Sequence, residues 1–170
     1  MPERSLSNPD QDVVDHLIGD WARERPDLDT SAMAVVGRLL HLGAVLQSRA
    51  NERLREHGIS YTELDVLATL RRSGAPYRLS PTELRKSVLL SSGAMTACLN
   101  RLEQRHLISR SPDDTDRRSL MATLTPQGVD LIEAAIAGHF SAAGQALGAL
   151  DLDEQAELAR LLRKFRLQLE

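Results

Sequence analysis

The chain has little of several residue types that would place it in a specialised class of protein. Its 170 residues include one cysteine, one tryptophan, two tyrosines and two phenylalanines. A single cysteine, Cys98, excludes an internal disulfide and agrees with a reducing compartment. No apolar run is long enough to cross a bilayer, and the first residues lack the apolar centre of a signal peptide. We therefore expect a cytoplasmic protein with an aliphatic core and no membrane partner.

Sequence motifs for catalysis and metal binding are also missing. The chain has no Gly-rich phosphate loop, no nucleophile elbow and no His-Glu-x-x-His segment. Its five histidines show no paired ligand spacing. We therefore expect no enzyme activity, no catalytic residue, no metal and no cofactor.

Helix signals are frequent along the whole chain. Its length suits one domain, and 42% hydrophobic with 26% charged residues is ordinary globular composition. Cap residues followed by apolar residues at helical spacing predict several helix starts. The signals are at Asn8, Asp29, Ser60, Ser80, Thr125 and Asp151. Gly58 and Gly148 are expected to end helices.

The stretch from Ser80 to Gly128 carries the sequence signals on which the prediction of the fold depends. Ser80, Pro81 and Glu83 form a capping box that begins a short helix. After a turn, a second helix carries Met95, Leu99 and Leu102 as an apolar stripe, with Ser91 or Ser92 as its cap.

Two segments with period-two alternation follow this second helix. They lie on either side of Pro112-Asp113-Asp114-Thr115 and predict a β-hairpin, to which Arg78-Leu79 could add a third strand. The fold class expected is therefore mainly α with a small β-hairpin wing: a winged helix-turn-helix with N- and C-terminal dimerisation helices.

Charge is distributed unevenly between this stretch and the remainder. Arg78 to Leu120 holds eight Lys or Arg against five acidic residues, whereas the whole chain has 21 against 24. A basic patch on an acidic body is the pattern expected of a protein that meets double-stranded DNA through one element.

Candidate DNA contacts fall on the second helix and on the wing. Short polar side chains and arginines can meet base edges and phosphates, and a wing arginine can approach the minor groove. The alternative is an ordinary polar helix face and a solvated charged turn. The candidates are Ser91, Ser92, Gly93, Met95, Thr96, Asn100, Arg101, Arg110, Asp116, Arg117 and Arg118.

The terminal helices have more apolar surface than a small DNA-reading region can cover. We expect residues 8–57 and 125–170 to form a dimerisation region around the DNA-binding region at 60–124, within one domain covering 1–170. A homodimer would read a palindrome with half-sites one helical turn apart.

The motifs resemble those of the MarR family of dimeric bacterial transcriptional regulators. The resemblance is carried by Asp113-x-x-Asp116-Arg117-Arg118, by Leu124-Thr125-x-x-Gly128 and by Leu64-Asp65-Val66-Leu67-x-x-Leu70. It implies a regulator that binds an operator as a homodimer, a repressor that responds to a small ligand.

The chain is also similar to the urate-responsive branch of that family, which has an extra N-terminal helix with a Trp. That similarity implies a ligand site at Trp21, Asp65 and Arg101, although Ser73 stands where the branch has Asn. We expect a small anionic or phenolic effector rather than urate. The alternatives are that Trp21 only packs and that Arg101 pairs with Asp65 or near Glu103 as scaffold.

Two further alternatives remain open at this point. A modified Cys98 on the reading helix would disturb DNA contact, which would make the protein a thiol-oxidation sensor; a buried thiol in the core is the other interpretation. The winged helix could also serve protein contacts or architectural, non-specific DNA binding.

Overall fold

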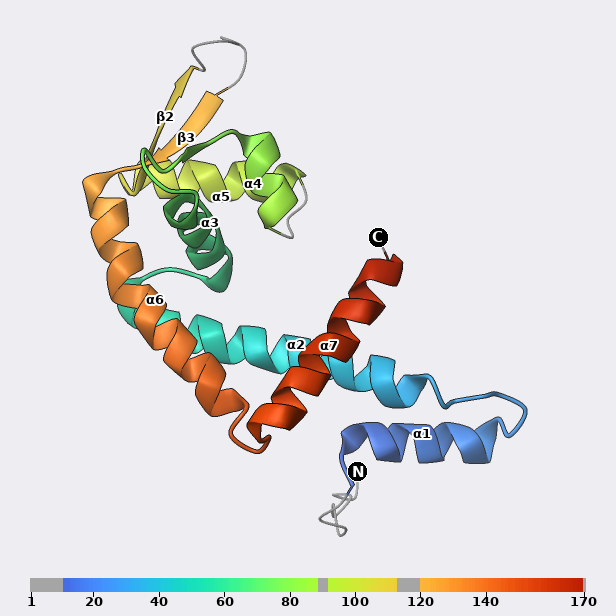
Figure 1. Ribbon diagram of the computed structural model, residues 1–170. Helices are drawn as coiled ribbons and strands as arrows, with labels where there is room; N and C mark the ends of the chain where they lie inside the picture. The colour runs from blue at the N-terminus through green and yellow to red at the C-terminus, as the bar shows by residue number, and fades with distance from the viewer. Residues whose placement is uncertain (1–10, 89–91, 113–119, 170) are drawn as a thin grey trace. The chain divides into compact units, whose positions relative to one another are not determined.

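The computed structural model describes residues 11–88, 92–112 and 120–169 (Figure 1). The chain divides into two compact units, with the boundary between Glu52 and Arg53. No helix in the described ranges combines the length and the apolar character needed to span a bilayer.

The first unit contains α1 (Val13–Glu24) and most of α2 (Met33–Leu54). We predicted that the first helix starts near Asn8, in a segment outside the described residues, but α1 begins at Val13. Asp12 is its N-cap and forms a capping box with Asp15, so an acidic pair replaces the expected Asn-Pro start.

Contacts between α1 and α2 hold the first unit together. Arg38 on α2 forms ion pairs with Asp12 and Asp15 at 2.8 and 2.7 Å. Val14 is buried, and a Cβ placed on Gly37 would lie 3.1 Å from its Cγ1. The glycine therefore lets the two helices approach closely, and this packing contributes more than the partly exposed ion pairs.

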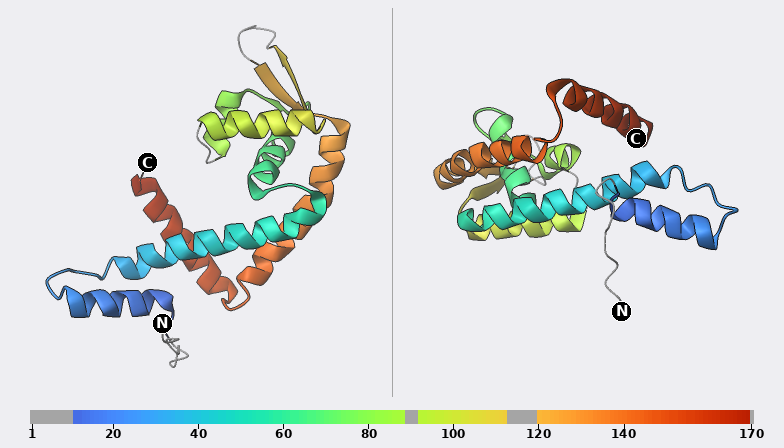
Figure 2. Two further views of the ribbon diagram at one scale, coloured as in Figure 1. Left: turned by 180° about the vertical axis from the view of Figure 1, so that it is seen from behind. Right: turned by 90° about the horizontal axis from the view of Figure 1, so that it is seen from below.

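The second unit contains the predicted helix-turn-helix and wing (Figures 1 and 2). Gly58, at φ +66°, ends the short 3₁₀ segment that continues α2, as predicted. The elements are η1 (Arg55–His57), α3 (Tyr61–Arg72), β1 (Arg78–Leu79), α4 (Pro81–Ser87), α5 (Ser92–Gln104), β2 (Ile108–Pro112), β3 (Leu120–Leu124), α6 (Pro126–Ala146) and α7 (Leu152–Leu169).

Ser60, Ser80, Thr125 and Asp151 are at helix starts as predicted, whereas Asp29 lies four residues before α2 begins at Met33. Ser60 with Glu63 and Ser80 with Glu83 each form a complete capping box. Asp151 accepts a hydrogen bond from the backbone N–H of Glu154, whose carboxylate accepts one in return. Each cap satisfies backbone donors that would otherwise lack partners, which fixes these boundaries locally.

The sheet has the order β1-β3-β2, and both pairings are antiparallel. Ser109 pairs with Thr123 in the hairpin, and Leu79 pairs with Ala122. The third strand predicted at Arg78-Leu79 is therefore present, and β3 lies between two neighbours.

An aliphatic core joins α3, α4, α5, the sheet and the first turns of α6. Leu67, Leu70, Leu84 and Leu102 are completely buried in it. This agrees with the aliphatic core predicted from the few aromatic residues. Burial of such apolar side chains supplies most of the stability of the unit.

The start of α6 crosses the backbone of Leu107 at the start of the wing. Thr125 donates its N–H to the Leu107 carbonyl at 3.1 Å and its hydroxyl to the His106 carbonyl at 2.6 Å. Thr125 Oγ1 also caps the N–H of Gly128 at 3.0 Å. A Cβ on Gly128 would lie 2.0 Å from the Leu107 oxygen. The Leu-Thr-x-x-Gly motif therefore joins the wing to α6.

Helix α7 differs from the others because none of its residues is buried. Leu158, Leu161, Leu162 and Phe165 lie on one side of it and are 38–47% exposed. An amphipathic helix gains most of its stability from burying its apolar side, so the apolar side of α7 lacks a partner surface within the described part of this chain.

Candidate nucleic-acid interface

The interface is built on α4 and α5, which pack on each other and on α3. Leu84 and Val88 on the α4 side and Leu99 on α5 are at most 2% exposed. Met95 is 1% exposed, so its side chain packs in the core. Our inclusion of Met95 among the DNA contacts is therefore corrected: it holds α5 in place and is not presented to DNA.

The opposite side of α5 is exposed. Gly93, Thr96 and Asn100 lie on it at spacings of three and four residues. Ser91 and the side chain of Ser92 lie outside the described residues, so their predicted capping and DNA contacts stay predictions.

Arg101 on α5 is tied to α3. Its Nε lies 3.3 Å from Oε1 of Glu63, whose side chain is 8% exposed while that of Arg101 is 53% exposed. Burial opposes ionisation of Glu63, but hydrogen bonds from the Ser60 backbone and hydroxyl and from Arg101 outweigh it and lower the pKa of the carboxyl. Arg101 therefore has a scaffold contact, but with Glu63 rather than with Asp65 or near Glu103 as predicted.

Arg110 on β2 is tied to α5. It donates from Nε to Oε2 of Glu103 at 2.8 Å and from Nη2 to Oδ1 of Asn100 at 2.8 Å. The hydrogen bond from Arg110 lowers the pKa of Glu103. We did not predict this cluster, although the alternation of β2 gave a signal for it: Arg110 shares a strand face with the buried Ile108.

The wing is the β2–β3 hairpin beside α5 (Figure 1). Asp116, Arg117 and Arg118 lie outside the described residues, and their DNA contacts stay predictions. Arg78 on β1 donates from Nη2 to the Pro112 carbonyl at 3.1 Å, which places a guanidinium at the end of β2.

Asp65 on α3 is half-buried, and burial raises its pKa despite the opposing charges of Arg72 and His139. Arg72 Nη1 lies 4.0 Å from its carboxylate. A carboxyl with a raised pKa is typical of binding sites. Trp21, 55% exposed, belongs to the other unit, so the predicted three-residue ligand site stays a prediction.

Cys98 is completely buried on the inner side of α5. Burial, with a smaller contribution from the charge of Glu63, raises the pKa of its thiol to about 11. These are the properties of an unreactive packing residue, and they give no support to oxidation sensing. In the described ranges, no three His, Cys, Asp or Glu side chains are grouped so as to hold a metal ion.

Comparisons with known proteins agree with this geometry. The model of the MarR family matches residues 59–120. The HTH-type transcriptional regulator PecS of Dickeya dadantii is 34% identical over 149 residues, which cover 88% of this chain and 90% of PecS.

Solved structures are similar as well. A mutant MarR from E. coli, complexed with operator DNA, is 27% identical with a TM-score of 0.70, over 85% of this chain and 96% of that one. BpsR of Bordetella bronchiseptica, whose DNA binding is regulated by 6-hydroxynicotinic acid, is 25% identical with a TM-score of 0.63, over 76% and 98%. This chain is therefore not an enzyme but belongs to the MarR family of transcriptional regulators.

Proposed function

We propose that the protein is a cytoplasmic, ligand-responsive repressor that binds a palindromic operator as a homodimer. The observation that carries this proposal is that α5 has two different sides. Leu99 and the other residues on its inner side are buried, whereas Thr96 and Asn100 are exposed beside the wing. A recognition helix held by its inner side presents its outer side to the major groove.

Selection of bound DNA from a random pool tests this proposal directly. We expect a twofold-symmetric motif with half-sites about 10 base pairs apart, bound at least about 10³-fold more tightly than unrelated DNA at physiological salt. Equal binding to all sequences would instead indicate an architectural module, and no DNA binding would indicate a protein-contact module.

The wing part of the proposal places Arg117 and Arg118 against the minor groove or its phosphates. If Arg118 neutralises a phosphate, Arg118→Ala reduces the slope of log K against log salt by about one. An unchanged affinity and slope would remove Arg118 from the interface.

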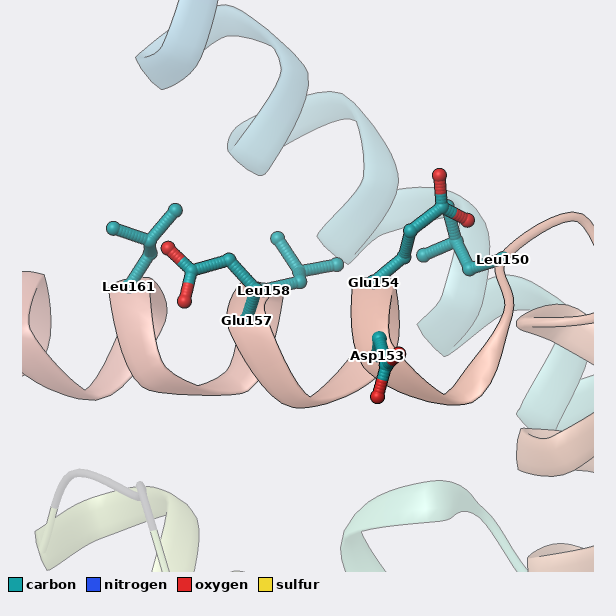
Figure 3. A pocket seen from close by; sticks show the side chains of 6 residues that line it. All are labelled: Leu150, Asp153, Glu154, Glu157, Leu158 and Leu161. Carbon is teal, nitrogen blue, oxygen red and sulfur yellow. The ribbon is translucent and has the colours of Figure 1, made fainter.

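The dimer part of the proposal rests on α7. Its exposed leucines border a hollow of about 510 Å³, lined by Leu150, Asp153, Glu154, Glu157, Leu158 and Leu161. Figure 3 shows Leu158 and Leu161 extending from one side of the helix. An apolar helix face with no partner among the described residues of its own chain is explained by a second copy, and two copies match a palindromic operator.

Leu161→Glu places a charge on this apolar side, and we expect it to yield monomers in analytical ultracentrifugation and to lose selective operator binding. Ala156→Glu is the matched control, because it adds the same charge on the opposite side of α7. A monomeric wild-type protein, or a Leu161→Glu dimer as tight as the control, would contradict the assignment.

The effector part of the proposal follows the similarity to BpsR. A small anionic or phenolic compound would meet the half-exposed guanidinium of Arg101 and the perturbed carboxyl of Asp65. We expect 6-hydroxynicotinate or a related hydroxybenzoate to release operator DNA in an anisotropy titration and to change the fluorescence of Trp21, the sole tryptophan. Trp21→Phe should remove the optical signal. A compound panel that leaves both signals unchanged would count against an effector.

A further inference from the structure

A three-residue cluster connects the wing strand β2 to the exposed side of α5. Arg110 lies on the inner face of β2, and its side chain is 22% exposed. Glu103 receives hydrogen bonds from Nε and Nη2 of Arg110, so their charges neutralise each other locally. Nη2 also donates to Asn100 Oδ1 at 2.8 Å. Arg110 is therefore anchored and can orient Asn100.

The chemistry of the guanidinium determines how the Asn100 amide is turned. Arginine has five N–H donors and no acceptor, so only the amide oxygen of Asn100 can face Arg110. The NH₂ group then points away from Arg110. Asn100 is exposed and lies four residues after Thr96, on the side of α5 opposite the core. The outward-facing polar group is thus a hydrogen-bond donor.

This orientation conflicts with the usual contact between asparagine and DNA. Asparagine normally binds adenine with both groups: its oxygen accepts from the N6 amino group and its NH₂ donates to N7. With Arg110 donating to the oxygen, the outward NH₂ of Asn100 can donate to N7 of either purine, but beside N7 adenine presents another donor, its N6 amino group. Guanine presents only acceptors, N7 and O6, at the same edge.

We propose that Asn100 is a specificity-determining residue that Arg110 and Glu103 preset as a hydrogen-bond donor, so that it selects guanine over adenine in the major groove. The inference rests on the proposed function, in which α5 enters that groove. It also makes Arg110 a positioning residue rather than the direct DNA contact we predicted.

The test starts from the motif that the wild-type protein selects from a random pool. At one base pair of each half-site, guanine should be preferred over adenine by about tenfold, the scale of one good polar contact to a base. Asn100→Ala should abolish that preference at this position alone. Asn100→Asp keeps an oxygen toward Arg110 but replaces the outward donor by an acceptor, and it should shift the preference to cytosine, whose N4 donates.

Variants of the positioning residues separate this role from a structural one. Arg110→Met frees the Asn100 oxygen, so the preference for guanine over adenine should fall from about tenfold to about onefold. The slope of log K against log salt should stay unchanged. Arg105→Met is the matched control: Arg105 donates to the Gly58 carbonyl at 2.8 Å, and its loss should not alter base preference. If Arg110→Met fails to fold by circular dichroism, Glu103→Gln provides the weaker form of the same perturbation, and Asn100→Asp tests the donor independently.

The outcomes are distinguishable. A wild-type motif whose guanine position disappears in Asn100→Ala supports the inference. A wild-type motif that Asn100→Ala leaves unchanged, or an equal loss of affinity for all sequences, overturns the inference and leaves the proposed function intact. A wild-type protein without any sequence preference overturns both.

Discussion

Gly128→Ala should destabilise the protein, because α6 crosses the wing at this residue. The added Cβ would lie 2.0 Å from the carbonyl oxygen of Leu107. Non-bonded heavy atoms prefer a separation of about 3.5 Å. One of the two backbones must therefore move by more than about 1 Å. The same carbonyl accepts the hydrogen bond from Thr125, and this hydrogen bond would weaken.

The size of the effect follows from three contributions. Overpacking in a tight region costs about 1–3 kcal/mol. A lost backbone hydrogen bond costs about 1 kcal/mol. The better helix propensity of Ala returns about 1 kcal/mol. We expect the free energy of unfolding of Gly128→Ala to fall by about 1–3 kcal/mol, which with an m-value of about 2 kcal/mol/M lowers the urea midpoint by about 0.5–1.5 M.

Urea unfolding followed by circular dichroism at one fixed protein concentration measures this change. Gly138→Ala is the control in the same helix, because a Cβ there would have no atom of the described residues within 4 Å. It should be neutral or stabilise by up to about 1 kcal/mol through helix propensity. If Gly128→Ala is as stable as Gly138→Ala, the close crossing of α6 over Leu107 is wrong.

Three further predictions concern titratable groups. Cys98, with its pKa raised to about 11, should react with a thiol reagent at pH 7.5 only after urea unfolds the protein; fast reaction of the native protein would contradict its burial. Glu63 has a lowered pKa, so it stabilises the fold above about pH 4.5 and loses this effect as pH falls further; Glu63→Gln should remove that acid-dependent part from urea midpoints measured between pH 3 and pH 7. Asp65 has a raised pKa, so its ionised form costs stability at neutral pH; Asp65→Asn should raise the midpoint at pH 7, with a difference that shrinks as pH falls toward 3.8, and a lower midpoint would refute this sign.

Local patterns were enough to predict most of the fold. The capping boxes at Ser60 and Ser80, the glycine stop at Gly58 and the alternation around the wing each depend on residues within a few positions of one another. Such signals fix where an element begins and ends regardless of what it packs against. The winged helix-turn-helix is the simplest arrangement of the elements they predict.

Contacts between elements could not be predicted in the same way. Arg101 and Glu63 are 38 positions apart, and several carboxylates were equally plausible partners for that arginine. Met95 was both a member of the apolar stripe and a DNA candidate; its periodicity was the better guide, since it is buried. The exposed residues of α5 share one side of the helix at spacings of three and four, but this pattern does not tell which of them would contact a base.

The two-sided construction of α5 has an evolutionary consequence. The helix is held by its buried inner residues and by its ion pairs with α3 and β2, so exchanges at the exposed Gly93 or Ala97 alter what it presents outward without removing these contacts. A duplicated copy of this protein can therefore acquire a new target sequence in a few steps while the scaffold stays the same. The same property makes these two positions the natural sites for a randomised library.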